Sequence, residues 1–324
     1  MTSTRASIFL SRTVPPAGRA LLEPEFSIRE WTGDGFITRE ALLQGVVGAN
    51  ALIVHPPDRV DKSVLDAAGS QLKVISTMSV GLEHIDIAEC RRRGIAVGYT
   101  PGVLTETTAE LTLALLLATS RRIKEGFKAV EKGIVGWQNG HWLCGKQING
   151  CTVGIVGLGR IGLAVAKRLQ PFGVAKFLYS GHSEKPGGAE IGATLVSFDE
   201  LLRKSDFVVA CCSMNEENKG LFNKDAFSKM KSDAIFINSS RGVLVNQEDL
   251  YDALKSGQIM AAGLDVTSPE PLPVDHQLKT LDSCVIFPHL GSATTDTRNV
   301  MAVTAAKNAI AGFKGQTLPS PVPL

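Results

Sequence analysis

The sequence has almost no excess of charge of either sign. It contains 34 Lys and Arg against 32 Asp and Glu in 324 residues, a formal net charge of +2. A protein that binds nucleic acid or an anionic membrane usually shows a basic stripe. Long apolar runs are also missing: the longest helical one, around residues 111–118, falls well short of the ~20 residues that span a bilayer. We therefore expect no nucleic-acid partner and no membrane segment.

Cysteines are few and follow no recognised metal or redox pattern. None of the six forms a CxxC pair or a Cys/His zinc spacing, so we expect no metal site. Cys211 and Cys212 lie within DFVVACCS, which is typical of a buried strand and predicts core packing. Scattered thiols in a chain of this length indicate a reduced, cytoplasmic protein. The six are Cys90, Cys144, Cys151, Cys211, Cys212 and Cys284.

The first residues contain no acidic side chain before Glu23. The segment MTSTRASIFLSR is rich in Ser, Thr and Arg, a composition that mitochondrial transit peptides share. The alternative is a first β-strand, residues 6–11, followed by a turn at Pro15–Pro16 into a helix. We favour the strand because the same strand–turn–helix unit recurs along the chain. At the other end, Pro323-Leu324 differs from the SKL-type peroxisomal signal.

Apolar side chains and glycine are what the sequence has in quantity, at 44% of residues and 32 residues respectively. A chain of this length suits two domains of roughly 150 residues. Continuous apolar runs separated by helical patterns are typical of parallel sheets covered on both faces. We therefore predict an α/β protein with two doubly wound parallel-sheet lobes. The predicted strands are 6–11, 49–55, 72–78, 95–99, 151–156, 177–180, 206–212, 234–238, 261–266 and 284–289, and the predicted helices include 61–68, 85–93, a long one at 105–132, and 295–314.

A glycine-rich loop joins the strand at 151–156 directly to a helical pattern. Residues 157–162 read GLGRIG, the GxGxxG spacing of dinucleotide-binding folds. Gly157 permits the tight turn, Gly159 lets the backbone approach a pyrophosphate, and Gly162 lets helix and strand pack closely. The helix N-terminus offers free N–H groups to the phosphates; a glycine-rich turn without ligand is the alternative. The residues we assign to the dinucleotide are Gly157, Gly159, Arg160, Ile161 and Gly162.

The second strand of this lobe ends without the acidic residue that NAD-preferring folds place on the ribose 2′-hydroxyl. It reads YSGHS from residue 179, with no acid until Glu184. A 2′-phosphate is therefore not repelled, and Ser180, His182 and Lys185 are available to bond it. We predict a preference for NADP(H), with NAD(H) as the alternative cofactor.

Three further strands are followed by residues that carry chemistry. Arg241 follows AIFIN, Glu270 follows AAGLDV, and His289 follows CVIF. Open α/β sheets bind ligands at the carboxyl ends of their strands, so we expect the three to share one site. Any one alone is more often a surface ion pair or a structural histidine. Together they predict a carboxylate-binding fork, an orienter for the histidine and an acid/base.

The sequence resembles the D-isomer-specific 2-hydroxyacid dehydrogenases, and among them the members that reduce glyoxylate and hydroxypyruvate. The matching stretches cover the chain from the first strand to the last helix in the family's order. They are STMSVGLEHID (76–86), TTAELTLALLLATSRR (107–122), VGIVGLGRIG (153–162), INSSRGVLVNQEDL (237–250), AAGLDVTSPEPLP (261–273) and FPHLGSATTDTR (287–298).

The resemblance implies a role for each of the three side chains. Arg241 would bind the substrate carboxylate and carbonyl oxygen, because its planar guanidinium suits bidentate recognition. His289 would donate a proton to the carbonyl oxygen as hydride arrives from the nicotinamide. Glu270 would hydrogen-bond the other imidazole nitrogen and orient the ring.

Further residues acquire roles in the same way. Asp265 would hold the nicotinamide carboxamide, with Gly291 also at the cofactor site. The backbone amides of Val80 and Gly81 would bind the substrate carboxylate. Ser79 beside them would shape the pocket or serve as a turn hydroxyl.

Five other residues allow simpler explanations. We expect His84 to cap a helix or face solvent at the helix start, not to take part in catalysis. Thr107 and Thr108 open a helix, where N-terminal capping explains them as well as cofactor contact does. Trp137 and Trp142 flank the irregular stretch at 133–150 through which the family forms its dimer. They would then be interface residues, one of them closing the partner's active site, or simply loop anchors.

The resemblance also implies how the domains are connected. A Rossmann cofactor domain, residues 105–291, would be inserted into a flavodoxin-like substrate domain, residues 1–104 and 292–324. The family places its cleft between the two, with a hinge near Leu104 and Gly291.

The implied function is an NADPH-preferring cytoplasmic reductase, acting as a homodimer. It would convert glyoxylate to glycolate and hydroxypyruvate to D-glycerate. A dehydrogenase for another short D-2-hydroxy acid is the first alternative. A dinucleotide-sensing transcriptional corepressor of the same fold is the second, although the sequence has no long Ser/Pro/Gly-rich tail. A binding protein without turnover is the third, and such a protein would not need the proton donor His289.

Overall fold

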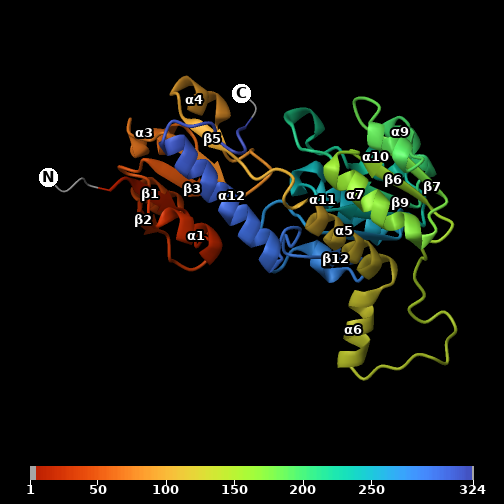
Figure 1. Ribbon diagram of the computed structural model, residues 1–324. Helices are drawn as coiled ribbons and strands as arrows, with labels where there is room; N and C mark the ends of the chain where they lie inside the picture. The colour runs from red at the N-terminus through yellow and green to blue at the C-terminus, as the bar shows by residue number, and fades with distance from the viewer. Residues whose placement is uncertain (1–4, 323–324) are drawn as a thin grey trace. The chain divides into compact units, whose positions relative to one another are not determined.

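The computed structural model describes residues 5–322, which form two compact units (Figure 1). The first unit comprises the described residues up to Leu104 together with those from Ala293 onward, and the second unit spans Thr105–Ser292. Each is an α/β lobe on an all-parallel sheet. The predicted fold class is therefore confirmed. Residues 1–4 and the Pro323-Leu324 end, on which the transit-peptide and peroxisomal considerations partly rest, lie outside the described residues.

The first unit has five strands: β1 (Ser7–Leu10), β2 (Ser27–Glu30), β3 (Ala51–Val54), β4 (Val74–Thr77) and β5 (Ala96–Gly98). Its helices are α1 (Pro16–Leu22), α2 (Arg39–Gly45), α3 (Lys62–Ala68), α4 (Ile87–Arg92) and α12 (Thr295–Phe313). The sheet order is β2-β1-β3-β4-β5, the flavodoxin-like arrangement. Its strands are all parallel, and the strand order reverses between β1 and β3. All residues of β3 and β4 are buried, as helices on both faces require. The strand at the chain start confirms the strand interpretation of that segment.

The last helix, α12, returns to complete the first unit. It packs along α1 and against β3, β4 and β5. Gly18 on α1 makes this close approach possible, because a Cβ at that position would lie 2.6 Å from the Ala302 carbonyl oxygen. The second unit is therefore inserted between Leu104 and Ala293 of the first.

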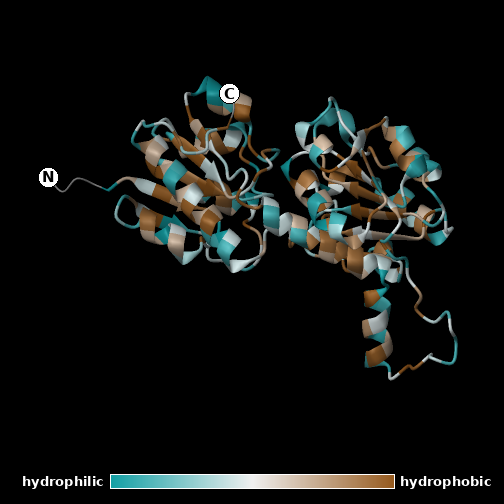
Figure 2. Ribbon diagram, turned by 45° about the vertical axis from the view of Figure 1, so that its right-hand side comes forward, coloured by the Kyte–Doolittle hydropathy of each residue, from teal (hydrophilic) through white to brown (hydrophobic). Residues whose placement is uncertain are grey.

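The second unit has seven strands: β6 (Thr152–Val156), β7 (Lys176–Ser180), β8 (Thr194–Leu195), β9 (Phe207–Ala210), β10 (Ile235–Asn238), β11 (Ala261–Leu264) and β12 (Cys284–Ile286). Its α-helices are α5 (Thr105–Ser120), α6 (Ile123–Glu131), α7 (Arg160–Leu169), α8 (Pro186–Glu190), α9 (Phe198–Lys204), α10 (Lys224–Lys229) and α11 (Gln247–Lys255). The sheet order β12-β11-β10-β9-β6-β7-β8 is doubly wound about β6. Two apolar clusters cover its faces, and the strands stand out as apolar in Figure 2. Because β10, β11 and β12 are consecutive neighbours, their carboxyl ends meet at one edge.

The predicted long helix at 105–132 is wrong, since α5 and α6 are separate. Arg122 takes a left-handed backbone conformation (φ 53°) between them, which ends the helical run. Its guanidinium forms two hydrogen bonds with Glu125, Nε to Oε1 at 2.8 Å and Nη2 to Oε2 at 2.6 Å. The break redirects α6 and the loop after it away from the sheet of the second unit (Figure 1).

Within residues 5–322, none of the helices combines the length and the apolar character needed to cross a membrane.

Candidate active site

The glycine loop forms the turn that its sequence predicts. Gly157 has φ 94°, and a Cβ there would lie 2.5 Å from the Cα of Cys212. A Cβ at Gly162 would lie 2.3 Å from the Gly157 carbonyl oxygen, so helix α7 and strand β6 meet at backbone distance. Around Gly159 a Cβ would meet no atom within 4 Å. The backbone is therefore closely packed at the two outer glycines, whereas free space lies beside the middle one.

The start of α7 is suited to bind phosphate. Gly159 is the N-cap residue, and no side chain in the described part of the chain caps this end of the helix. Arg160 and Ile161 form its first turn. An uncapped helix N-terminus beside an open glycine carries free N–H groups and partial positive charge. These residues fit the pyrophosphate of a dinucleotide.

The end of β7 lies beside the glycine loop. The Ser180 carbonyl accepts a hydrogen bond from Gly157 N at 2.9 Å, and Ser180 is buried while His182 is exposed. The segment then closes on itself, with Lys185 N donating to Tyr179 Oη at 3.1 Å. Lys185 Nζ donates to Ser183 Oγ at 3.2 Å. The structure thus places the residues predicted to bind a 2′-phosphate next to the loop predicted to bind the pyrophosphate.

His289 and Glu270 form a direct pair at the carboxyl end of β11 and β12. His289 Nδ1 donates to Glu270 Oε2 at 2.8 Å, and the histidine side chain remains 44% exposed. Glu270 Oε1 accepts from Thr267 N at 2.9 Å. Burial raises the pKa of Glu270, but the hydrogen bond and charge of His289 outweigh it, so the pKa lies below its ordinary value. Glu270 is therefore a charged acceptor that holds one ring nitrogen and leaves the other free to face solvent.

Asp265, directly after β11, fixes the turn that carries His289. Its Oδ1 accepts from Leu290 N at 2.7 Å, and its Oδ2 accepts from Gly291 N at 2.9 Å. His289 N donates to the Asp265 carbonyl at 2.8 Å. Burial raises the pKa of this carboxyl group against the opposing effect of the two amides. His289 itself has φ 57°, a conformation that persists only where the surroundings impose it, and Asp265 supplies that constraint.

Arg241 follows β10 and belongs to the same edge. Asn238 holds its loop, with Oδ1 accepting from Ser240 N at 3.0 Å and Nδ2 donating to the Arg241 carbonyl at 2.9 Å. Ser240 Oγ also donates to the Cys212 carbonyl. The Arg241 guanidinium lowers the pKa of Glu270 through its charge. The second unit thus brings Arg241, Glu270 and His289 together as the sequence predicted.

Val80 and Gly81 follow β4 in the first unit. Neither backbone N–H donates a hydrogen bond within the part of the chain that the structure describes. Ser79 Oγ donates to the Gly81 carbonyl at 2.7 Å, and the Ser79 carbonyl accepts from Thr100 N at 2.9 Å. Ser79 therefore serves as a turn hydroxyl, and two backbone amides of this turn have no acceptor among the described residues.

The simpler role expected of His84 is wrong, and of the two explanations left open for Thr108, capping does not describe its contact. His84 is buried, with Nε2 3.0 Å from Thr77 Oγ1, and the cap of α4 is Asp86, whose carboxylate accepts from Glu89 N. Thr108 is buried inside the second unit, and its hydroxyl donates to the Gly291 carbonyl at 3.0 Å. Helical position alone does not show which way a side chain points into a fold.

The first unit contains a buried polar cluster that the sequence reasoning missed. Asp58 accepts from Ser11 Oγ, from His55 N at 2.9 Å and from Arg12 Nη2 at 3.1 Å. Burial above all, with the charges of Arg12, Arg298 and His84, holds the pKa of His55 well below its ordinary value. The signal was present, since Ser11 and His55 directly follow the apolar runs of β1 and β3.

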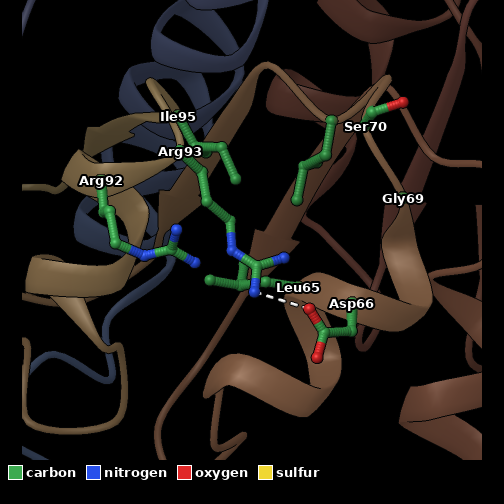
Figure 3. A pocket seen from close by; sticks show the side chains of 8 residues that line it. Leu65, Asp66, Gly69, Ser70, Arg92, Arg93 and Ile95 are labelled. Carbon is green, nitrogen blue, oxygen red and sulfur yellow. Dashed lines mark hydrogen bonds and ion pairs between the residues drawn. The ribbon is translucent and has the colours of Figure 1, made fainter.

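A surface hollow of the first unit is lined by Asp66, Arg92 and Arg93 among others (Figure 3). Arg93 Nη2 donates to Asp66 Oδ1 at 2.6 Å, and both arginines bond Glu89. Its charges are therefore paired within the chain, and we assign it no ligand. In the described range, no group of three His, Cys, Asp or Glu side chains is arranged to hold a metal.

Helix α6 and the following loop expose an apolar strip. Phe127 and Val130 are 68% and 80% exposed, and Trp137 is 83% exposed. Trp142 is half-buried and packs on Gly136, where a Cβ would lie 2.6 Å from the indole ring. Trp137 thus belongs to a surface and Trp142 to the loop's own packing. The exposed members of the strip are Ile123, Phe127, Val130, Ile134, Val135 and Trp137.

Comparison with known proteins gives a consistent result. The family described as D-isomer specific 2-hydroxyacid dehydrogenase, NAD binding domain, matches residues 113–291. A Mus musculus protein named Glyoxylate reductase/hydroxypyruvate reductase is 53% identical over 322 residues, which is 98% of each chain. The crystal structure of the TT0316 protein from Thermus thermophilus aligns with a TM-score of 0.92 at 42% identity, over 98% of this chain and all of that one. An NADPH-dependent glyoxylate/hydroxypyruvate reductase from Sinorhizobium meliloti, solved with NADP and malonate, aligns with a TM-score of 0.83 at 27% identity. The alignment covers 98% of this chain and 97% of that one.

Proposed function

The chain belongs to the D-isomer-specific 2-hydroxyacid dehydrogenase family, and from this premise we propose that it reduces glyoxylate to glycolate and hydroxypyruvate to D-glycerate. The observation that carries the proposal is the His289–Glu270 pair, joined at 2.8 Å beside the Arg241 loop. A relative that is 53% identical bears the name of this activity. The remaining residues are assigned according to this reaction.

His289 is proposed as the proton donor. Glu270 accepts from Nδ1, so Nε2 is the atom that faces the substrate carbonyl oxygen. The charged Glu270 stabilises positive charge on the ring and fixes its orientation. A bound nicotinamide dinucleotide supplies the hydride for the carbonyl carbon. In the reverse direction His289 takes the hydroxyl proton back.

The keto acid is proposed to be held through its carboxylate. Arg241 offers a planar fork of N–H donors that matches a carboxylate and its neighbouring carbonyl. Val80 and Gly81 offer backbone amides that donate to no acceptor in the described chain. We accordingly assign residues 1–104 and 292–324 to the substrate and residues 105–291 to the cofactor.

The proposed reaction is tested by following NADPH absorbance with glyoxylate, hydroxypyruvate, pyruvate and a longer 2-keto acid. We expect turnover with the first two substrates, and D-glycerate as the product of hydroxypyruvate. Turnover confined to pyruvate or to the longer acid supports the alternative of a dehydrogenase for another D-2-hydroxy acid. No turnover with any of them refutes the reductase and leaves the corepressor or binding alternatives.

We also propose that NADPH is preferred over NADH. Ser180 and the exposed His182 lie where NAD-preferring folds carry an acid, and Lys185 is close by. Ser180→Asp introduces a carboxylate that repels a 2′-phosphate, so kcat/KM with NADPH should fall by ~10-fold or more while NADH use is retained. Equal kcat/KM values for the two coenzymes in the native enzyme contradict the preference.

A homodimer is proposed through the apolar strip of α6 and its loop. Contiguous exposed apolar side chains are typical of protein interfaces. Phe127→Glu should convert the dimer to a monomer in sedimentation analysis. Val274→Glu is the matched control, because Val274 is 92% exposed but lies outside the strip. A monomeric native protein refutes this assembly.

A cytoplasmic location is proposed from the cysteines. All six are free thiols, as expected in a reducing compartment.

A further inference from the structure

We propose that Thr108 and Thr112, one turn apart on α5, are positioning residues that hold the Arg241 loop and the His289 loop in a fixed relation to each other. The inference rests on the proposed reductase function, because it concerns the geometry of the groups assigned to that reaction. Both threonines are buried in the second unit, at 5% and 0% exposure.

Thr108 fixes the segment after His289. Its Oγ1 donates to the Gly291 carbonyl at 3.0 Å, while Gly291 N donates to Asp265 Oδ2 at 2.9 Å. The peptide units on either side of Gly291 are therefore held from two directions. A Cβ at Gly291 would lie 3.3 Å from Asp265 Oδ2 and 3.4 Å from Thr108 Cγ2, so the segment is also closely packed.

Thr112 fixes the segment before Arg241. Its Oγ1 donates to the Thr108 carbonyl at 2.7 Å. A threonine hydroxyl has one proton, so in the 2.6 Å contact between Thr112 Oγ1 and Ser239 Oγ the serine is the donor. Ser239 lies next to Asn238, whose side chain bonds both Ser240 N and the Arg241 carbonyl. The helix is thus linked to the Arg241 loop by the Thr112–Ser239 hydrogen bond, the peptide link from Ser239 to Asn238 and the two hydrogen bonds of the Asn238 side chain.

The two threonines act together because they share one face of a rigid element. Residues at i and i+4 of a helix lie on the same side, and α5 packs against β10, β11 and β12. Proton transfer requires the donor within hydrogen-bond distance of a carbonyl that Arg241 positions. A small displacement between the two loops therefore affects turnover more than it affects coenzyme binding at the glycine loop.

Thr119 offers a matched control on the same helix. It is buried, and its Oγ1 donates to the Leu115 carbonyl at 2.7 Å, the same i−4 bond that Thr112 makes. Among the described residues it makes no hydrogen bond to either loop. Substitution by Val at any of these sites keeps the volume and removes the hydroxyl.

The experiment compares Thr108→Val, Thr112→Val and Thr119→Val in the full-length enzyme, with Thr112→Ser as the conservative variant. We expect the first two to lower kcat by ~10-fold, because misplacement of reacting groups costs rate. NADPH affinity should stay unchanged in Thr112→Val, whose contact leads to the Arg241 loop. Thr112→Ser keeps the hydroxyl and should therefore retain most of the native kcat. Thr119→Val should lower Tm about as much as Thr108→Val and Thr112→Val do, but it should leave kcat unchanged.

A readout independent of turnover separates this inference from the proposed function. NMR signals of the His289 ring should shift in Thr108→Val and Thr112→Val but not in Thr119→Val. If the native enzyme turns over no keto acid, the proposed function fails while the ring signals still test the positioning. Equal kcat in all three valine variants, or a His289 ring unaffected in the first two, overturns the inference.

Discussion

Each unit places a histidine and a carboxylate just beyond the ends of its parallel strands, yet the two arrangements differ in every detail that matters for chemistry. In the first unit His55 is 6% exposed, and Asp58 accepts from its backbone N–H, not from its ring. In the second unit Glu270 accepts from the ring of His289, whose side chain is 44% exposed. The first arrangement satisfies a buried carboxylate, and the second prepares an accessible proton donor.

The comparison shows what strand-end position does and does not establish. Ligands bind at the carboxyl ends of strands in open α/β sheets, but the same positions also hold polar residues that close the fold. Two features distinguish a ligand-binding histidine from a structural one: the exposure of its ring, and whether the ring or the backbone N–H bonds the carboxylate. His55 has neither an exposed ring nor a carboxylate on the ring, so we expect it to contribute to stability and not to turnover.

The largest expected effect separates the two histidines directly. His289→Ala should lower kcat for hydroxypyruvate by ~10²-fold or more, the usual scale for losing a general acid. His55→Leu should leave kcat near the native value, because its ring is buried and no carboxylate in the described part of the chain accepts from it. Steady-state NADPH oxidation by both variants measures the difference. Comparable losses of kcat in the two variants would contradict the different roles assigned to His289 and His55.

Arg241→Lys should have the next largest effect. Lysine keeps the charge but lacks the planar fork that matches a carboxylate and carbonyl, so we expect kcat/KM for the keto acid to fall ~10-fold or more. NADPH binding, measured by fluorescence titration, should be unchanged because the glycine loop is untouched. An unaltered KM and kcat would remove Arg241 from substrate binding.

Acid stability should distinguish the units more subtly. The depressed pKa of His55 keeps it neutral in the fold, while the unfolded chain binds a proton below about pH 6.5. Stability from this group is therefore complete above about pH 6.5 and is lost as pH falls below it. The lowered pKa of Glu270 acts in the same direction but only below about pH 4.3.

Urea unfolding between pH 7.5 and 5, followed by Trp31 fluorescence in a Trp137→Phe, Trp142→Phe background, measures the first window. His55→Leu should flatten the pH dependence over this range. Glu270→Gln serves as the control and should leave it as in the native protein. A pH dependence retained in His55→Leu would assign it to another group.

Sequence reasoning succeeded where apolar runs and glycine spacing dictate the backbone. The central strands β3, β4, β9, β10 and β11 are buried along their whole length, and β6 is buried except at its first residue; that pattern predicts all six. The edge strands β2 and β8 were not, because their residues are mostly half-buried or exposed and lack the pattern. The helix break at Arg122 also carries no glycine or proline to announce it.

The sequence predicted which side chains form the site, but it did not predict the hydrogen bonds that hold them in place. Arg241, Glu270 and His289 follow recognisable strands, whereas the grip of Asp265 on two amides depends on the left-handed backbone at His289. The contacts of Thr108 and Thr112 depend on which strands become neighbours and which face of α5 they meet. Both are properties of packing, which local sequence does not encode.

The His289–Glu270 pair is tested most directly by steady-state hydroxypyruvate reduction in the native enzyme and in Glu270→Gln. Removing the carboxylate removes the charged acceptor that orients the His289 ring. We predict that kcat falls by ~10-fold or more while NADPH affinity is retained, because a misplaced proton donor costs rate. An unchanged kcat in Glu270→Gln would contradict the assignment of the His289–Glu270 pair as the proton donor.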